Sequence, residues 1–164
     1  MDAAIELTLP SYTHCFCCGQ GNDCGLRLVF REVAGEARTE WCPAARHGGY
    51  RGIVHGGVAA AVLDETLGWG AYLGSKLMVV TADLSVRYSR SLEIGRPVTV
   101  RARMVENQRD RIVHATGEIV DGDGRVAMKA KGRFIPVPRA TVDEVQRYLT
   151  QPEGTPALEY RNRP

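Results

Sequence analysis

Apolar and polar positions along the chain follow two periods, and the change between them predicts the order of the elements. Leu26–Val33 and Glu36–Cys42 alternate apolar and polar residues on either side of Gly35, which predicts a β-hairpin. An alanine- and leucine-rich run over Val58–Leu73 instead has the spacing of a long helix. Four later runs predict strands, at residues 76–88, 97–106, 111–120 and 125–135.

The connections support this order of elements. The segment between the hairpin and the helix, residues 43–52, is a glycine-rich loop, and the DGDG sequence at 121–124 is a strong hairpin turn. One long helix among six strands predicts an α+β fold, in which a curved antiparallel sheet of about six strands wraps round the helix and hides its apolar sides. We expect a short terminal helix at 141–149, followed by a mobile tail.

Length and composition are those of one compact domain. The chain has 164 residues, of which 44% are hydrophobic, so we interpret residues 1–164 as a single domain with its core at about 15–137. With 21 Lys and Arg against 19 Asp and Glu, the net charge of +2 does not indicate nucleic-acid binding. The sequence has no long apolar run, and its amino terminus lacks the features of a signal peptide. We therefore expect a cytoplasmic protein that does not bind membranes.

Five cysteines, Cys15, Cys17, Cys18, Cys24 and Cys42, raise the question of a metal site. Their odd number without a secretory signal favours free thiols over a disulfide framework. Cys15 and Cys18 have the CxxC spacing, and His14 and Cys24 could complete a tetrahedral zinc site. Structural zinc usually draws on a second ligand pair, and none follows downstream. We therefore expect no metal, and a reduced, mainly structural cluster.

The sequence IVHGGVAAAVLDET, at 53–66, carries the chemistry-bearing residues at the start of the helix. The amides of Gly56 and Gly57 point along the helix axis with the positive end of its dipole, where they could stabilise an oxygen that gains negative charge. Gly57 could equally be a permissive cap residue. Asp64 lies seven residues further on, about 10 Å along the helix. Glu65 is about 100° away round the helix, so we expect only one of these acids to face a given pocket.

The distance between Gly57 and Asp64 predicts an assembly. One carbonyl group cannot readily contact both on the same helix. If two copies pair with their long helices antiparallel, Asp64 of each faces the glycine end of the other, and symmetry gives two equivalent sites. Alternatively, Asp64 is a solvated charge on a helix surface.

These residues resemble the hotdog-fold acyl-CoA thioesterases, in particular the phenylacetic-acid-degradation (PaaI-like) type. The resemblance covers residues 15–137 and rests on three blocks in order: CFCCGQGNDCGLRL, GIVHGGVAAAVLDETLGWGA and VTADLSVRYSRSLEIGRPV. It implies a homodimer or a dimer of dimers, with active sites at the dimer interface. It also implies hydrolysis of an acyl-CoA to a free acid and CoA, which needs neither metal nor redox cofactor.

The resemblance further implies a role for each site residue. Gly57 would polarise the thioester carbonyl, with Gly56 beside it and His55 orienting the loop or the substrate. Asp64 would be the nucleophile or the general base, and Thr81 would hold the water or the acyl group. Some relatives carry Asn or Gln shortly before the HGG, whereas this chain offers His47 as a substitute.

Basic residues of the later strands are candidates for the phosphates of CoA. Residues 87–133 hold 11 Lys and Arg against 6 Asp and Glu. A solvated strand face explains such charges as well. The candidates are Arg87, Arg90, Arg109, Arg111, Lys129 and Lys131, of which we expect two or three to bind phosphate. Two other functions remain open: an acyl-CoA binding protein without catalysis, which would have no need of Asp64, and a hotdog hydratase or dehydratase, which would act on the acyl chain.

Overall fold

The computed structural model describes residues 6–153, 155 and 157–161 and has the order of elements that the sequence predicts. The helices are α1 (Gly56–Ser75), α2 (Arg139–Gln146) and a short 3₁₀ helix at Ala45–His47. The strands are β1 (Glu6–Thr8), β2 (Ser11–Tyr12), β3 (Arg31–Val33), β4 (Glu36–Trp41), β5 (Val79–Tyr88), β6 (Val98–Gln108), β7 (Ile112–Asp121), β8 (Val126–Pro136) and β9 (Leu149–Thr150).

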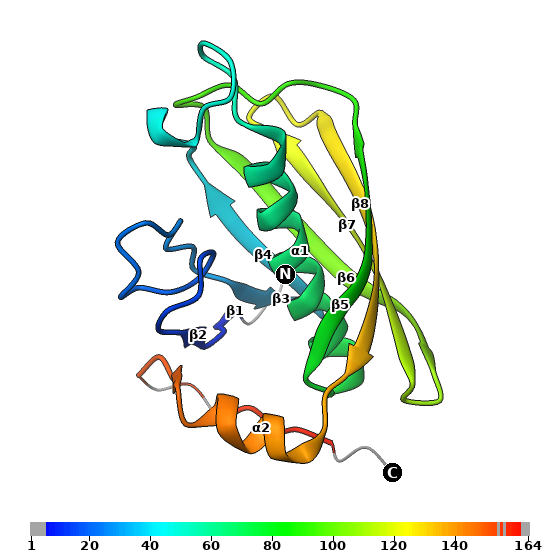
Figure 1. The fold of residues 1–164 in the computed structure, drawn as a ribbon. Helices are drawn as coiled ribbons and strands as arrows, with labels where there is room; N and C mark the ends of the chain where they lie inside the picture. The colour runs from blue at the N-terminus through cyan, green and yellow to red at the C-terminus, as the bar shows by residue number, and fades with distance from the viewer. Residues whose placement is uncertain (1–5, 154, 156, 162–164) are drawn as a thin grey trace.

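Seven strands form one antiparallel sheet that curves round α1 (Figure 1). Their order is β1-β3-β4-β6-β7-β8-β5, so β5 is an edge strand although it is ten residues long. The second sheet contains only β2 and β9. A long helix packed in the curve of an antiparallel sheet is the hotdog fold, and the α+β prediction is confirmed.

One face of α1 packs on the sheet because its apolar residues recur at helical spacing. Ala59, Leu63, Leu67 and Ala71 are each fully buried. Close contact depends on small residues, since a Cβ on Gly70 would lie 2.9 Å from the backbone of β6. This close packing fixes which side of α1 remains for a site.

The first predicted strand is only partly a strand. Residues 26–30 do not form a strand, and Arg27 has a φ of 53°, in the left-handed region. Leu26 and Leu28 donate their amides to the carbonyls of Phe16 and Cys17 in the cysteine-bearing turn, residues 15–24, instead of a neighbouring strand. Their alternating side chains are buried as expected. The strands β1, β2 and β9, of two or three residues each, are too short for a periodic pattern to reveal.

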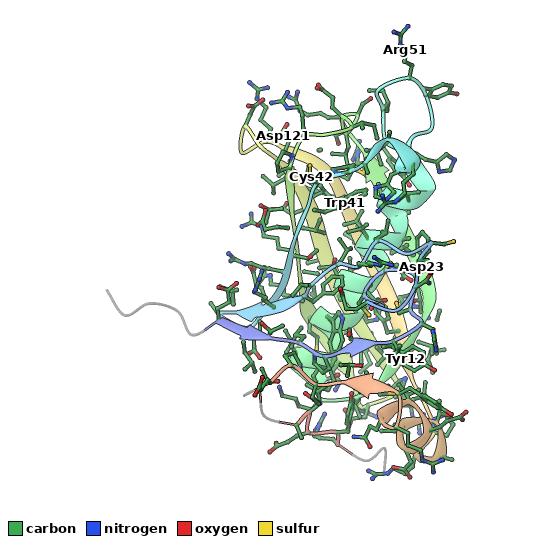
Figure 2. All side chains as sticks on the ribbon, turned by 90° about the vertical axis from the view of Figure 1, so that its left-hand side faces the viewer. Tyr12, Asp23, Trp41, Cys42, Arg51 and Asp121 are labelled. Carbon is green, nitrogen blue, oxygen red and sulfur yellow. The ribbon has the colours of Figure 1, made fainter. Side chains whose placement is uncertain are left out.

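The C-terminal segment packs against the fold instead of forming a mobile tail. α2 begins two residues earlier than expected and ends at Gln146, and β9 then pairs with β2 near Tyr12 (Figure 2). Beyond it, Tyr72 of α1 donates a hydrogen bond to the carbonyl of Glu159. Arg161 donates to the carbonyl of Ser75. The expectation of a mobile tail is therefore wrong for the described part, because aromatic and cationic side chains anchor it at the end of α1.

The loop before α1 projects from the other end of the molecule. Figure 2 shows Arg51 at its tip, pointing away from the rest of the chain. Across the described residues, neither helix combines the length and apolar character needed to span a bilayer.

Candidate functional site

A cavity of about 480 Å³ lies along α1 at the end where β5 begins. Its walls come from α1, from residues 78–81, from the cysteine-bearing turn and from the C-terminal segment. Most of the wall is apolar, with Trp69, Val79, Val80 and Val145 among its residues. The polar side chains are few and include Asp64, Glu65 and Thr81, together with Cys15 and Cys18. An apolar pocket with a few convergent polar groups is typical of a small-molecule site.

Asp64 and Thr81 meet in this cavity. The Thr81 hydroxyl donates a hydrogen bond of 2.8 Å to Oδ1 of Asp64, joining the middle of α1 to the start of β5. A β-bulge lies directly after Thr81, because Thr81 pairs with Phe134 whereas Asp83 pairs with Arg133. Bulges redirect side chains and are frequent beside active sites. The hydrogen bond orients the carboxylate and leaves Oδ2 for a second partner.

Glu65 lines the same cavity, which corrects the expectation that only one of the two acids could do so. The cavity has two walls that meet at α1, and Asp64 faces β5 while Glu65 faces the cysteine-bearing turn. The Sγ of Cys15 lies 3.7 Å from both carboxyl oxygens of Glu65. The two side chains do diverge round the helix, but a pocket this wide receives both.

The pKa values of Glu65 and Cys15 shift in opposite directions. Burial, followed by the charge of Cys15, raises the pKa of Glu65 to about 7. Hydrogen bonding with Cys17 and Cys18 lowers the pKa of Cys15, and the same interactions raise the pKa of those two thiols. The backbone amides of Cys17 and Cys18 also point at Sγ of Cys15. Of these three thiols Cys15 therefore ionises most readily, and Glu65 holds its proton to a higher pH than an ordinary carboxyl group does.

The start of α1 is capped by its own histidine. Nδ1 of His55 accepts a hydrogen bond of 3.0 Å from the Gly57 amide, so this amide is already paired. The carbonyl of Gly56 accepts from the hydroxyl of Tyr88. Among the described residues, none accepts from the amide of Gly56. Gly56 therefore offers the free N–H at this helix end, whereas the resemblance implied Gly57.

His47 is buried and does not line the cavity. It is 7% exposed, its ring lies 5.7 Å from that of Trp41, and Nδ1 accepts a hydrogen bond from the Ala44 amide. Its carbonyl accepts from the amide of His55. Burial lowers the pKa of His47, which favours the neutral ring. In this position His47 supports the loop before α1.

The four candidate arginines lie at two ends of the sheet. Arg87 is paired across β5 and β8 with Lys129, six residues along β5 from Thr81, which is about 20 Å. Arg90 follows β5 at the same end. Arg109 and Arg111 instead occupy the turn between β6 and β7. Thr81 pairs with Phe134 and Phe134 pairs with Val113, so this turn lies at the same end of the sheet as Thr81. None of the four lines the cavity.

The structure therefore brings together only part of the predicted site. Asp64 and Thr81 share the cavity, while His55, Gly56 and Gly57 lie at the N-terminal end of the same helix, eight residues or about 12 Å from Asp64 to Gly56. Glu65, Cys15 and Cys18 were not expected in the site. The CxxC spacing was the signal that could have found the cysteines, but nothing in the sequence connects them to Glu65.

Comparison with known proteins gives a family match over the central segment. Residues 51–128 match the family described as Thioesterase superfamily. The structure of the thioesterase superfamily protein RHA08564 is 30% identical, with a TM-score of 0.69, and the match covers 74% of this chain and 60% of that chain. This chain thus spans about three fifths of the length of that relative. Comparison with curated proteins gives no match.

Two more distant structures share the fold. The PaaI protein of the Escherichia coli phenylacetic acid degradation operon is 16% identical, with a TM-score of 0.62, over 68% of this chain and 80% of that chain. A hypothetical thioesterase from Streptococcus pneumoniae TIGR4, solved with coenzyme A, is 22% identical, with a TM-score of 0.57, over 63% of this chain and 79% of that chain. At these identities the likeness shows the fold alone.

Proposed function

We propose that this chain, whose residues 51–128 belong to the thioesterase superfamily, hydrolyses an acyl-CoA thioester to a free acid and CoA. The observation that carries the proposal is the hydrogen bond between Asp64 and Thr81 in a largely apolar cavity. Placing a carboxylate among apolar walls costs free energy. A functional role explains why the chain keeps one there. The apolar walls suit an acyl group, and a thioester is activated enough for one carboxylate and one oxyanion donor to suffice.

In the proposed reaction, Asp64 acts through the oxygen that Thr81 leaves free. Thr81 holds Oδ1, so Oδ2 accepts the proton of a water molecule as the water oxygen attacks the thioester carbon. The resulting oxyanion is stabilised by a backbone amide, the C–S bond breaks, and CoA leaves as a thiolate that takes up a proton. Direct attack by the carboxylate, followed by hydrolysis of the anhydride, uses the same two residues.

The oxyanion donor comes from a second copy of the chain. Gly56 carries the unpaired amide, but it lies about 12 Å from Asp64 along α1. A dimer with antiparallel helices would bring the Gly56 amide of one copy to Asp64 of the other. The ten-residue edge strand β5 supports such pairing, because a long open edge with exposed Val80 and Tyr88 is a surface that proteins normally cover. A dimer of dimers would repeat the same site.

Coenzyme A is the proposed leaving group because two structures of the same fold contain it or its acetyl ester. One is the Streptococcus pneumoniae protein with coenzyme A, and the other is smu.793 of Streptococcus mutans, bound to acetyl CoA. The Streptococcus pneumoniae protein has also been solved with an aspartate and, separately, a threonine replaced by alanine. These are the two residue types that this chain pairs in its cavity. Within the superfamily, the chain is proposed to be of the PaaI-like type.

A panel of acyl-CoA esters tests the function. Free CoA released by the purified chain is trapped with a thiol-reactive chromophore, with aromatic and aliphatic esters of increasing length compared at equal concentration. The proposal expects turnover that saturates with at least one ester. If no ester is cleaved but calorimetry measures binding, the chain is a binding protein. The paired state of the Gly57 amide favours that second function, since it leaves one donor fewer for an oxyanion.

A further inference from the structure

Cys15, Cys18 and Glu65 form a group that the proposed reaction does not use. We propose that this group binds one zinc ion, with three protein ligands and a fourth position that opens into the cavity. One ligand atom from each residue lies within 4.8 Å of the others. All three residues line the cavity. Two thiols and a carboxyl group converging in a half-buried place is a donor set that zinc accepts.

Backbone amides point at both sulfurs of the cysteine-bearing turn. Sγ of Cys15 accepts hydrogen bonds from the amides of Cys17 and Cys18, at 3.3 and 3.5 Å. Sγ of Cys18 accepts from the amide of Tyr12 at 3.4 Å. N–H groups aimed at a sulfur stabilise its negative charge, as the outer partners of a metal site do. The turn needs a glycine next, because a Cβ on Gly19 would lie 2.4 Å from the carbonyl oxygen of Cys15.

The distances fit a tetrahedral ion after a small contraction. With zinc–sulfur bonds of about 2.3 Å and zinc–oxygen bonds of about 2.0 Å, tetrahedral ligand atoms are roughly 3.5 to 3.8 Å apart. Sγ of Cys15 already lies 3.7 Å from each oxygen of Glu65. The upper limit of 4.8 Å for the group leaves at most about 1 Å to close, which side-chain rotation supplies.

The other candidate ligands are directed elsewhere. The thiol of Cys17 donates to the carbonyl of Ala61 at 3.3 Å. His14 and Cys24, which the CxxC spacing suggested as partners, do not belong to the group. The fourth ligand is therefore a water molecule or a ligand in the cavity, the arrangement of zinc sites with an open position.

A cation also explains why a carboxyl group and two thiols are gathered together. Without one, the anionic forms repel each other, and the group must hold protons instead. Zinc displaces those protons and leaves three ligand charges against its own two. The thiolates favour zinc over magnesium and calcium, which prefer oxygen ligands. The site is independent of the proposed hydrolysis, because Asp64 and Thr81 are not ligands.

The test measures metal directly on the full chain. The reduced, metal-free protein is titrated with Zn²⁺ against a chromogenic chelator, and elemental analysis after dialysis gives the stoichiometry. We expect one ion per chain. Cys15→Ser, Cys18→Ser and Glu65→Gln should each weaken binding by more than the 10- to 100-fold that is typical of losing an outer partner. Cys24→Ser and Cys42→Ser, at two exposed cysteines, are matched controls that should bind as the unaltered chain does.

Cobalt keeps the test decisive if a variant fails to fold. The unaltered protein with Co²⁺ should show the intense sulfur-to-metal charge-transfer absorption of two thiolates and the visible bands of a four-coordinate ion. Absence of zinc binding by the folded, reduced protein would overturn the proposal. So would binding that survives the loss of Cys15 and Cys18, or a six-coordinate cobalt spectrum without thiolate absorption. A Cys15–Cys18 disulfide in protein purified without air would show that the pair is redox-active instead.

Discussion

Replacing Asp64 by asparagine removes the proposed base without changing its shape. The amide side chain would keep an oxygen for the Thr81 hydroxyl but could accept no proton from water. Loss of a positioned base lowers a rate by about 10² to 10⁴. We expect kcat to fall in this range with a modest change in KM. Glu144→Gln, which neutralises an exposed acid on α2 that does not line the cavity, is the control and should keep the rate of the unaltered chain.

Thr81→Val tests the same hydrogen bond from the other side and should lower kcat by less than Asp64→Asn does. A hydrogen bond to a charged group is worth about 1.5 to 3 kcal/mol, which corresponds to roughly 10- to 150-fold in rate if all of it acts in the transition state. The hydroxyl lies 2.8 Å from Oδ1, so we expect a fall in kcat within that range. If Thr81 acts only by orienting Asp64, adding Thr81→Val to Asp64→Asn should cost little more.

The assay for this double-mutant cycle is release of CoA by the four proteins at saturating acyl-CoA, with circular dichroism to check the fold. An Asp64→Asn variant within a few-fold of the unaltered rate would refute the assignment. If instead the two effects multiply in full, Thr81 contacts the substrate itself rather than Asp64. Loss of all turnover in the Glu144→Gln control would show that the assay reports stability and not chemistry.

Three further predictions concern assembly, CoA and pH. Sedimentation at assay concentration should show at least a dimer, and Val80→Lys on the edge strand β5 should weaken both association and activity; a fully active monomer would contradict the shared site. Arg87→Glu and Arg111→Glu, at opposite ends of the sheet, should differ in their effect on KM while kcat stays nearly constant; if neither raises KM, the CoA phosphates bind elsewhere. Burial lowers the pKa of His47, so the unfolded chain binds its proton more readily, and stability should fall as the pH drops below 6.5. Melting temperatures at pH 7.5 and 5 should converge in His47→Asn, and an unchanged pH dependence would count against this origin.

The fold could be predicted because its signal is local. The helical spacing of buried residues such as Leu63 and Leu67, and the alternation along the four later strands, depend only on neighbours in the sequence. The prediction failed where contacts at a distance decide the structure. Leu26 and Leu28 alternate like a strand, yet they bond to the cysteine-bearing turn. No local pattern near the C-terminus predicts that Arg161 will donate a hydrogen bond to the carbonyl of Ser75 at the end of α1.

For the site, too, local sequence signals are predictive and contacts between distant segments are not. The HGG sequence and the position of Asp64 mark the helix, but the sequence leaves open whether His55 orients the substrate or hydrogen-bonds its own turn, as it does with the Gly57 amide. A histidine two residues before an amide is a weak capping signal, because the usual caps are Ser, Thr, Asp and Asn. The bulge directly after Thr81 has no marker in the sequence either, since it arises from the register between β5 and β8. Pairing between distant segments therefore determines which residues meet.

The two neighbouring acids show how such pairing gives similar residues different surroundings. Asp64 and Glu65 differ by one step along α1, and on sequence alone both are acids beside an apolar run. The edge strand covers one side of the helix and supplies a hydroxyl that stabilises a carboxylate. The cysteine-bearing turn covers the other side, where burial and the neighbouring sulfur raise the pKa of Glu65 to about 7. Substitution should therefore separate their roles. Asp64→Asn should lose turnover and keep zinc, and Glu65→Gln should lose zinc. If both variants lost both properties, the cavity would hold one coupled site, and the assignment of a separate metal site would fail.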